Sequence, residues 1–190
     1  MRNLKKIIQR GIDHHPINAS LVAGALFGIS FPPFPFPFPV LILLSIAIWV
    51  EIAIASISIR QAITRIFYGM LLANLIVSYW LVMATIGGGI AAIVAKAVVM
   101  SLMLTPFIAL TRMLKAEQLW WFLLLPLAWV FAEGIDFFWD LSYPWLLIGN
   151  AWADNPWAYQ YIRYTSVLGL STWVCLGGII VHRMLFVRPS

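Results

Sequence analysis

The chain of 190 residues has few charged side chains and a single cysteine. It contains 12 Lys and Arg and 7 Asp and Glu, so charged residues make up 10% of the sequence, whereas a soluble domain carries about 25%. So few charges cannot cover the surface of a water-soluble globule. The lone Cys175 excludes an intramolecular disulfide framework and any cysteine-based zinc or iron–sulfur site.

Apolar sequence is abundant. Hydrophobic residues account for 63% of the chain, which has 10 Trp and 12 Phe. The net charge of +5 is compatible with nucleic-acid binding, but the basic residues form short clusters between apolar runs and no patch interleaved with aromatics. We therefore predict an integral membrane protein, and we expect no nucleic-acid partner, no metal site and no cofactor.

The apolar runs predict an all-α, polytopic fold in a single transmembrane domain covering residues 1–190. A basic segment, 1–15, precedes the first run. A secretory signal peptide is an alternative for this start, but no small-x-small cleavage site follows it. A membrane-spanning helix needs about 20 residues, and six helices are predicted: 16–31, 40–59, 66–86, 90–111, 119–135 and 158–182.

The distribution of basic residues predicts the orientation. If the N-terminus is cytoplasmic, the loops on the other side contain no Lys or Arg, and they carry Asp136, Asp140 and Asp154. This asymmetry favours six spans with both termini in the cytoplasm. The basic residues on the cytoplasmic side are then Arg2, Lys5, Lys6, Arg10, Arg60, Arg65, Arg112, Lys115, Arg183 and Arg188. The remaining two basic residues, Lys96 and Arg163, lie within or at the edge of spans.

Residues 31–39 alternate phenylalanine and proline. Proline at every second position forbids a helix and favours an extended, polyproline-like course. A ligand for a proline-binding domain is one interpretation, but it would place the phenylalanines in water beside the bilayer. We expect instead an aromatic connector in the membrane interface.

Polar side chains within the predicted spans are candidates for function, because burying them in a bilayer is costly. Glu51, Asn74 and Lys96 fall inside spans. Two interpretations stay open for Glu51 and Lys96: pairing with other buried polar groups, or an intramembrane transport pathway. Glu133 lies at the outer end of the fifth span, before an aromatic loop. We expect Cys175 to be an inert buried thiol, and Glu133, Lys96 and Cys175 to share no polar cavity.

Other motifs fail to define an active site. Asp136 and Asp140 have the spacing of a magnesium-binding motif of membrane prenyltransferases, but the second acidic motif of that family is absent. His14 and His15 lack partners for a metal site. The glycines at 87–89 have no Walker lysine, so they predict a turn between spans and no phosphate loop. The residues alone predict no catalytic group.

Several segments nevertheless form a pattern. They are 125–133 (LPLAWVFAE), 142–151 (SYPWLLIGNA) and 160–171 (QYIRYTSVLGLS). This series resembles the membrane domain of apolipoprotein N-acyltransferase, the last enzyme of bacterial lipoprotein maturation. Residues 24–33 (GALFGISFPP) and 80–88 (WLVMATIGG) are similar to the opening helix and to the Trp…Thr…Gly-Gly segment of that family. The similarity covers nearly the whole chain.

The resemblance implies an activity and its partners. In that family a phospholipid donates an acyl chain to a cysteine, and the resulting thioester acylates the N-terminal amine of a diacylglyceryl-lipoprotein. The catalytic Glu, Lys and Cys belong to a nitrilase-like periplasmic domain inserted after a seventh span. Because this chain stops at Ser190 after six predicted spans, we expect no catalytic residue in it and no activity without a nitrilase-like partner. A truncated product and half of a split enzyme both fit. The implied location is the bacterial cytoplasmic (inner) membrane.

The membrane part is then expected to form a lipid-facing vestibule, with a plain aromatic belt as the alternative. Pro144 is expected to break the helix before Trp145, Gly149 to allow close backbone packing, and Glu133 to accept hydrogen bonds from loop amides. Other functions remain open: a non-enzymatic lipid- or protein-binding membrane protein, or a small transporter. The candidate vestibule or structural residues are Glu133, Tyr143, Pro144, Trp145, Gly149, Trp139 and Trp80.

Overall fold

The computed structural model describes residues 11–12, 14–35, 37–114, 119–138 and 144–187, and every regular element among them is helical. This confirms the all-α prediction. Three short 3-10 helices connect the α-helices: η1 (Phe38–Val40), η2 (Pro144–Leu146) and η3 (Ile148–Trp152). The α-helices are α2 (Pro16–Gly28), α3 (Leu41–Ala55), α4 (Ile59–Ser78), α5 (Trp80–Ala84), α6 (Ile86–Met103), α7 (Thr105–Met113), α8 (Trp121–Ile135) and α9 (Pro156–Phe186).

Four segments are long and apolar enough to cross a membrane. They are Phe38–Ala55, Ile59–Ser78, Ile86–Met113 and Gln160–Phe186. The helices α2, with 13 residues, and α8, with 15, are apolar but shorter than a typical span. The fold is thus that of a membrane protein, and a count of six spans needs α2 and α8 to cross as well.

The third and fourth predicted helices differ most from the structure, and the prediction of a turn at 87–89 was wrong, because these glycines belong to α6. The third begins at Ile59, seven residues before the predicted start, because the Ser58 side chain caps α4 by accepting from the Gln61 N–H at 3.1 Å. The fourth is interrupted at Leu104 between α6 and α7. Pro106, two residues further on, has no N–H to continue the helical hydrogen bonds.

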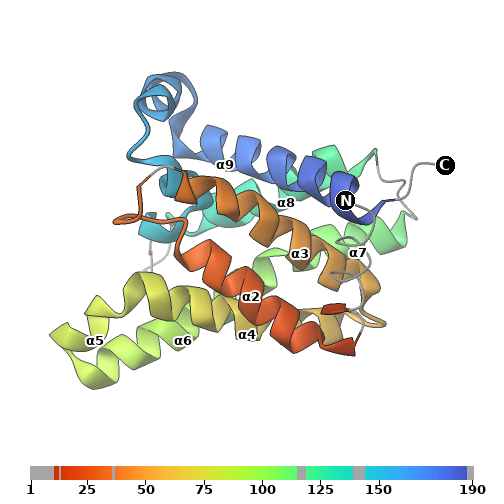
Figure 1. Cartoon of the computed structure of the whole chain (residues 1–190), viewed down its shortest axis with the longest axis horizontal. Helices are drawn as coiled ribbons and strands as arrows, with labels where there is room; N and C mark the ends of the chain where they lie inside the picture. The colour runs from red at the N-terminus through yellow and green to blue at the C-terminus, as the bar shows by residue number, and fades with distance from the viewer. Residues whose placement is uncertain (1–10, 13, 36, 115–118, 139–143, 188–190) are drawn as a thin grey trace.

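The predicted sixth helix is bent. Within α9 the residue Ser166 has φ 58° and ψ −179°, a conformation that costs a residue other than glycine about 1–3 kcal/mol. The Ser166 hydroxyl accepts from the Leu168 N–H at 3.2 Å and so caps the second part of the helix. The bend turns the first part of α9 away from the second part (Figure 1).

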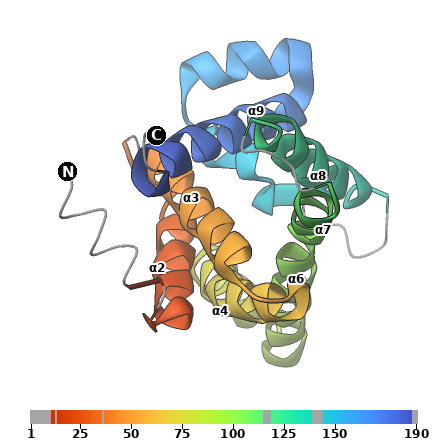
Figure 2. The ribbon, with the colours of Figure 1, turned by 90° about the vertical axis from the view of Figure 1, so that its right-hand side faces the viewer.

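The helix α3 lies in the middle of the bundle. Figure 2 shows α2 and α4 on one side of it and α7, α8 and α9 on the other. Nine of its 15 residues are buried, among them Trp49. The start of α2 and the end of α9 lie at one end of the bundle, whereas α5 and the two helices η2 and η3 lie at the opposite end (Figure 1).

The backbones of α2 and α4 touch where they cross. A Cβ added to Gly24 would overlap the Gly69 carbonyl, and one added to Gly69 would overlap the Ser20 carbonyl. Trp49 Nε1 donates to Ser20 Oγ at 3.1 Å, which ties α3 to the same crossing. Small residues allow this close approach between helices in a membrane.

The Phe/Pro segment is folded into turns, so the prediction of an extended course was wrong. The Phe34 N–H donates to the Phe31 carbonyl at 3.2 Å, and the Phe38 N–H donates to the Pro35 carbonyl at 3.0 Å. Prolines cannot donate, but their carbonyls still accept, and the alternating phenylalanines supply the donors. The Phe31 ring is buried, whereas Phe34 and Phe38 are exposed with ring centroids 5.9 Å apart.

Candidate functional site

Glu133 connects the end of α8 to the loop that contains η2 and η3. Its side chain is buried, and Oε1 accepts from Trp129 Nε1 at 3.0 Å and from the Ile148 N–H at 2.7 Å. The expected hydrogen bond to a loop amide is therefore present. The second oxygen, Oε2, has no well-aligned donor among the described residues. Glu133 thus fixes the start of η3 against α8.

Further bonds hold the same loop against α9. The Gly149 N–H donates to Ser171 Oγ at 3.1 Å, and the Ser171 hydroxyl lies beside the Glu133 carboxylate. A Cβ on Gly149 would meet the Val167 carbonyl, so glycine permits the close packing expected at this position. Asn150 Nδ2 donates to the Pro144 carbonyl at 2.8 Å and ties η3 back to η2. The loop is anchored at several points to buried groups.

An ion pair lies one helical turn beyond Glu133. Lys96 Nζ on α6 contacts Asp136 Oδ2 at the end of α8 at 2.5 Å, and both side chains are buried. Of the two interpretations left open for Lys96, the structure supports pairing. The attraction between the two charges offsets much of the free energy that it costs to remove them from water. The pair links α6 to the same end of α8 that holds the loop.

Glu133, Lys96 and Cys175 come from α8, α6 and α9, and the expectation that they share no polar cavity stays a prediction. Both Lys96 and Cys175 lie close enough to Glu133 to interact with its charge. They converge because α8 packs against both α6 and α9, a relation that the order of the spans does not reveal. Convergence does not make Cys175 accessible, since its side chain is fully buried.

Glu51 pairs with a residue that the sequence analysis did not single out. His182 Nε2 on α9 lies 2.8 Å from Glu51 Oε2 on α3. Residues 131 positions apart come together because α3 packs along α9. In the part of the chain that the structure describes, no three His, Cys, Asp or Glu side chains cluster closely enough to hold a metal ion.

An aromatic contact joins the loop to α5. The Trp80 and Trp145 rings lie with centroids 5.9 Å apart, and their side chains are about half exposed, at 45% and 44%. Pro144 begins η2, which directly presents Trp145. Trp139 and Tyr143 lie outside the described residues. The other candidates, Glu133, Pro144, Trp145, Gly149 and Trp80, belong to one assembly at this end of the bundle.

The arrangement fixes the position of a surface loop. The carboxylate of Glu133 and the thiol of Cys175 are buried, so neither can reach a substrate without unfolding the packing around them. The polar groups instead hold a loop whose tryptophan faces outward. The fold and the site together define a helical membrane domain. At one end of it, hydrogen bonds from buried polar side chains hold an aromatic loop in place.

Comparisons with known proteins identify the family. The family model described as the apolipoprotein N-acyltransferase N-terminal domain matches residues 23–180, and the chain belongs to this family. A curated relative is the apolipoprotein N-acyltransferase of Chlorobaculum tepidum, which is 29% identical over 121 residues. The alignment covers 64% of this chain but 22% of the relative. No solved structure matches the chain.

Proposed function

We propose that this chain is the membrane part of an apolipoprotein N-acyltransferase of the bacterial inner membrane. It presents phospholipid and a diacylglyceryl-lipoprotein precursor to a nitrilase-like catalytic partner, which carries out the acyl transfer. The family match over residues 23–180 is the observation that carries the proposal. A nucleophilic cysteine must reach the acyl ester as a thiolate, and the burial of Cys175 supports a catalytic cysteine outside the described residues.

The aromatic loop is the proposed vestibule for lipid. Tryptophan favours the level of the lipid headgroups, because its ring is apolar and its N–H is polar. Trp80 and Trp145 present half-exposed rings from two different elements, α5 and η2. Glu133 and Ser171 keep the loop in one geometry by binding its amides. An acyl chain entering from the bilayer would then meet a fixed aromatic surface.

The charge distribution supports an orientation with this loop on the periplasmic side. Arg60 in the first turn of α4, Arg112 in the last turn of α7 and Arg183 in the last turn of α9 belong to the end of the bundle where α2 begins and α9 ends (Figure 1). Arg163 is the exception, since it lies in the first part of α9. We propose six spans, with both termini in the cytoplasm, in agreement with the positive-inside rule. Glu51 and Lys96 are paired with His182 and Asp136, and this pairing favours a structural role for the two charges over a transport pathway.

The experiment is acyl transfer by the chain reconstituted in proteoliposomes with the catalytic domain of a relative. Trp80→Ala and Trp145→Ala should each lower the yield of N-acylated lipoprotein, measured by mass spectrometry. Trp120→Ala is the matched control, because Trp120 is also exposed but precedes α8, at the other end of that helix from Glu133. Equal yields from all three variants would leave the vestibule without support.

A further inference from the structure

Two arginines meet at the turn between α3 and α4. Arg65 Nη1 on α4 donates to Ser56 Oγ at 3.0 Å, and Arg112 Nη2 on α7 donates to the Ser56 carbonyl at 2.6 Å. Arg112 also reaches the Ala53 carbonyl at 3.4 Å. Two guanidinium groups from different helices are therefore gathered around one buried serine.

These two positive charges have no negative partner in the part of the chain that the structure describes. The ion pairs there are Lys96–Asp136 and His182–Glu51, and neither includes Arg65 or Arg112. The carbonyls at the end of α3 carry only partial negative charge. Glu117, the acidic residue nearest to Arg112 in sequence, lies outside the described residues. Two like charges held together favour a bound anion at this corner.

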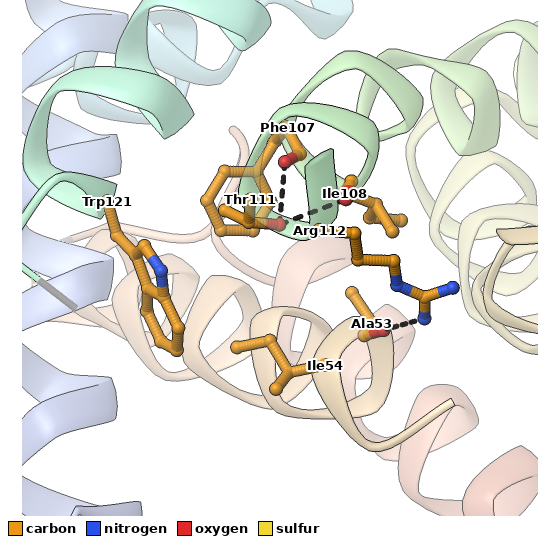
Figure 3. A pocket seen from close by; sticks show the side chains of 7 residues that line it. All are labelled: Ala53, Ile54, Phe107, Ile108, Thr111, Arg112 and Trp121. Carbon is orange, nitrogen blue, oxygen red and sulfur yellow. Dashed lines mark hydrogen bonds between the residues drawn. The ribbon is translucent and has the colours of Figure 1, made fainter. Parts of the chain in front are cut away.

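A cavity of about 130 Å³ lies beside Arg112, between α3, α7 and α8 (Figure 3). Arg112 and Trp121 lie on opposite sides of it, and Ile54, Phe107 and Ile108 contribute apolar walls. Trp121 is 7% exposed, and its indole N–H has no acceptor among the described residues. A buried donor without an acceptor is costly. The cavity is therefore bounded on one side by Arg112, whose guanidinium is turned toward the Ala53 and Ser56 carbonyls, and on the other by an indole N–H without an acceptor.

This combination fits an oxyanion attached to an apolar body. A guanidinium binds phosphate oxygens strongly, and the indole N–H can donate to a phosphate or ester oxygen. Basic pockets between membrane helices on the cytoplasmic side bind anionic lipid headgroups. The corner also faces outward, since Ile57 in the turn is 90% exposed and Ile54 is exposed as well.

We propose that the corner formed by Ser56, Arg65, Arg112 and Trp121 binds the phosphate of an anionic phospholipid from the leaflet at the basic end of the bundle. This lipid is distinct from the acyl donor, because the corner lies at the end opposite the aromatic loop (Figure 1). The bound phosphate, with its single negative charge, offsets part of the charge of the two guanidinium groups and holds α3, α7 and α8 together. The site does not depend on the proposed acyl-transfer function.

The test is thermal unfolding of the full chain, stripped of lipid in detergent and titrated with three probes. Phosphatidylglycerol should raise the midpoint saturably, whereas phosphatidylcholine and inorganic phosphate at equal phosphorus concentration should not. Trp121→Phe should weaken the apparent affinity for phosphatidylglycerol by about tenfold. Trp120→Phe is the matched control, because Trp120 is exposed and should bind as the unaltered chain does.

A second pair of variants separates a specific site from general positive charge. Arg112→Gln should abolish the shift, whereas Arg60→Gln removes the same charge from an exposed arginine of α4 and should retain it. Ile54→Phe fills the cavity without altering a polar group and should also abolish the shift. The proposal is wrong if phosphatidylglycerol has no effect, if inorganic phosphate alone has the same effect, or if Trp121→Phe and Ile54→Phe respond as the unaltered chain does.

Discussion

Replacing Glu133 by alanine removes the acceptor that joins α8 to the aromatic loop. Two buried donors, Trp129 Nε1 and the Ile148 N–H, would lose their partner. Each orphaned donor costs about 1–3 kcal/mol, so we expect Glu133→Ala to lower the free energy of unfolding by about 2–6 kcal/mol. Glu133→Gln keeps an acceptor oxygen of the same reach, and we expect it to cost under about 2 kcal/mol.

Glu51→Ala is the comparison, because it removes a carboxylate that contacts His182. The Glu51 side chain retains 14% exposure, so screening weakens its pair, and we expect a loss of about 1–2 kcal/mol. For a chain of this length 1 kcal/mol corresponds to about 2–4 °C in the unfolding midpoint. Glu133→Ala should therefore shift the midpoint by about 4–24 °C and Glu51→Ala by about 2–8 °C.

Thermal unfolding in detergent measures both shifts, and hydrogen exchange of the peptide covering residues 144–152 localises the effect. Exchange at the Ile148 amide should accelerate in Glu133→Ala and stay unchanged in Glu51→Ala. Equal midpoint shifts, together with unaltered exchange at Ile148, would refute the claim that Glu133 fixes the loop.

Three further outcomes follow from buried contacts. Lys96→Met and Asp136→Leu should each cost about 3–5 kcal/mol, and the double variant should recover most of the loss; additive losses in a denaturant-based double-mutant cycle would contradict the pairing. Gly149→Ala should destabilise by about 1–3 kcal/mol because its Cβ meets the backbone of α9, whereas Gly87→Ala has open space and should be neutral or gain up to about 1 kcal/mol. Cys175 should resist maleimide in the folded chain and react after denaturation, since it is fully buried; rapid labelling of the folded chain would show that the thiol is accessible.

The sequence could predict those features that depend on composition and local order. The scarcity of charge and the length of the apolar runs indicated a helical membrane protein, and the matched segments around Glu133 and Trp145 indicated the family. Pro16 marks the observed start of α2, as expected for proline in a first helical turn. These signals lie within one segment each and need no knowledge of how the helices cross.

Contacts between distant segments could not be predicted in this way. Lys96 and Asp136 are 40 residues apart and Glu51 and His182 are 131 apart, and their pairing depends on which helices are neighbours. The bend at Ser166 was also missed, because serine is not the residue expected at a positive φ. The Phe/Pro connector was misjudged because the Phe34 N–H donates to the Phe31 carbonyl and the Phe38 N–H to the Pro35 carbonyl, which closes turns.

The central claim is that this chain presents the lipid substrates within the membrane and that the catalytic groups lie on a nitrilase-like partner. Its most direct test is mass spectrometry of a diacylglyceryl-lipoprotein incubated with phospholipid and the purified chain, with and without that partner. We predict no triacylated product from the chain alone and clear product when both are present. Triacylated product from the chain alone, above the level in protein-free vesicles, would contradict the claim.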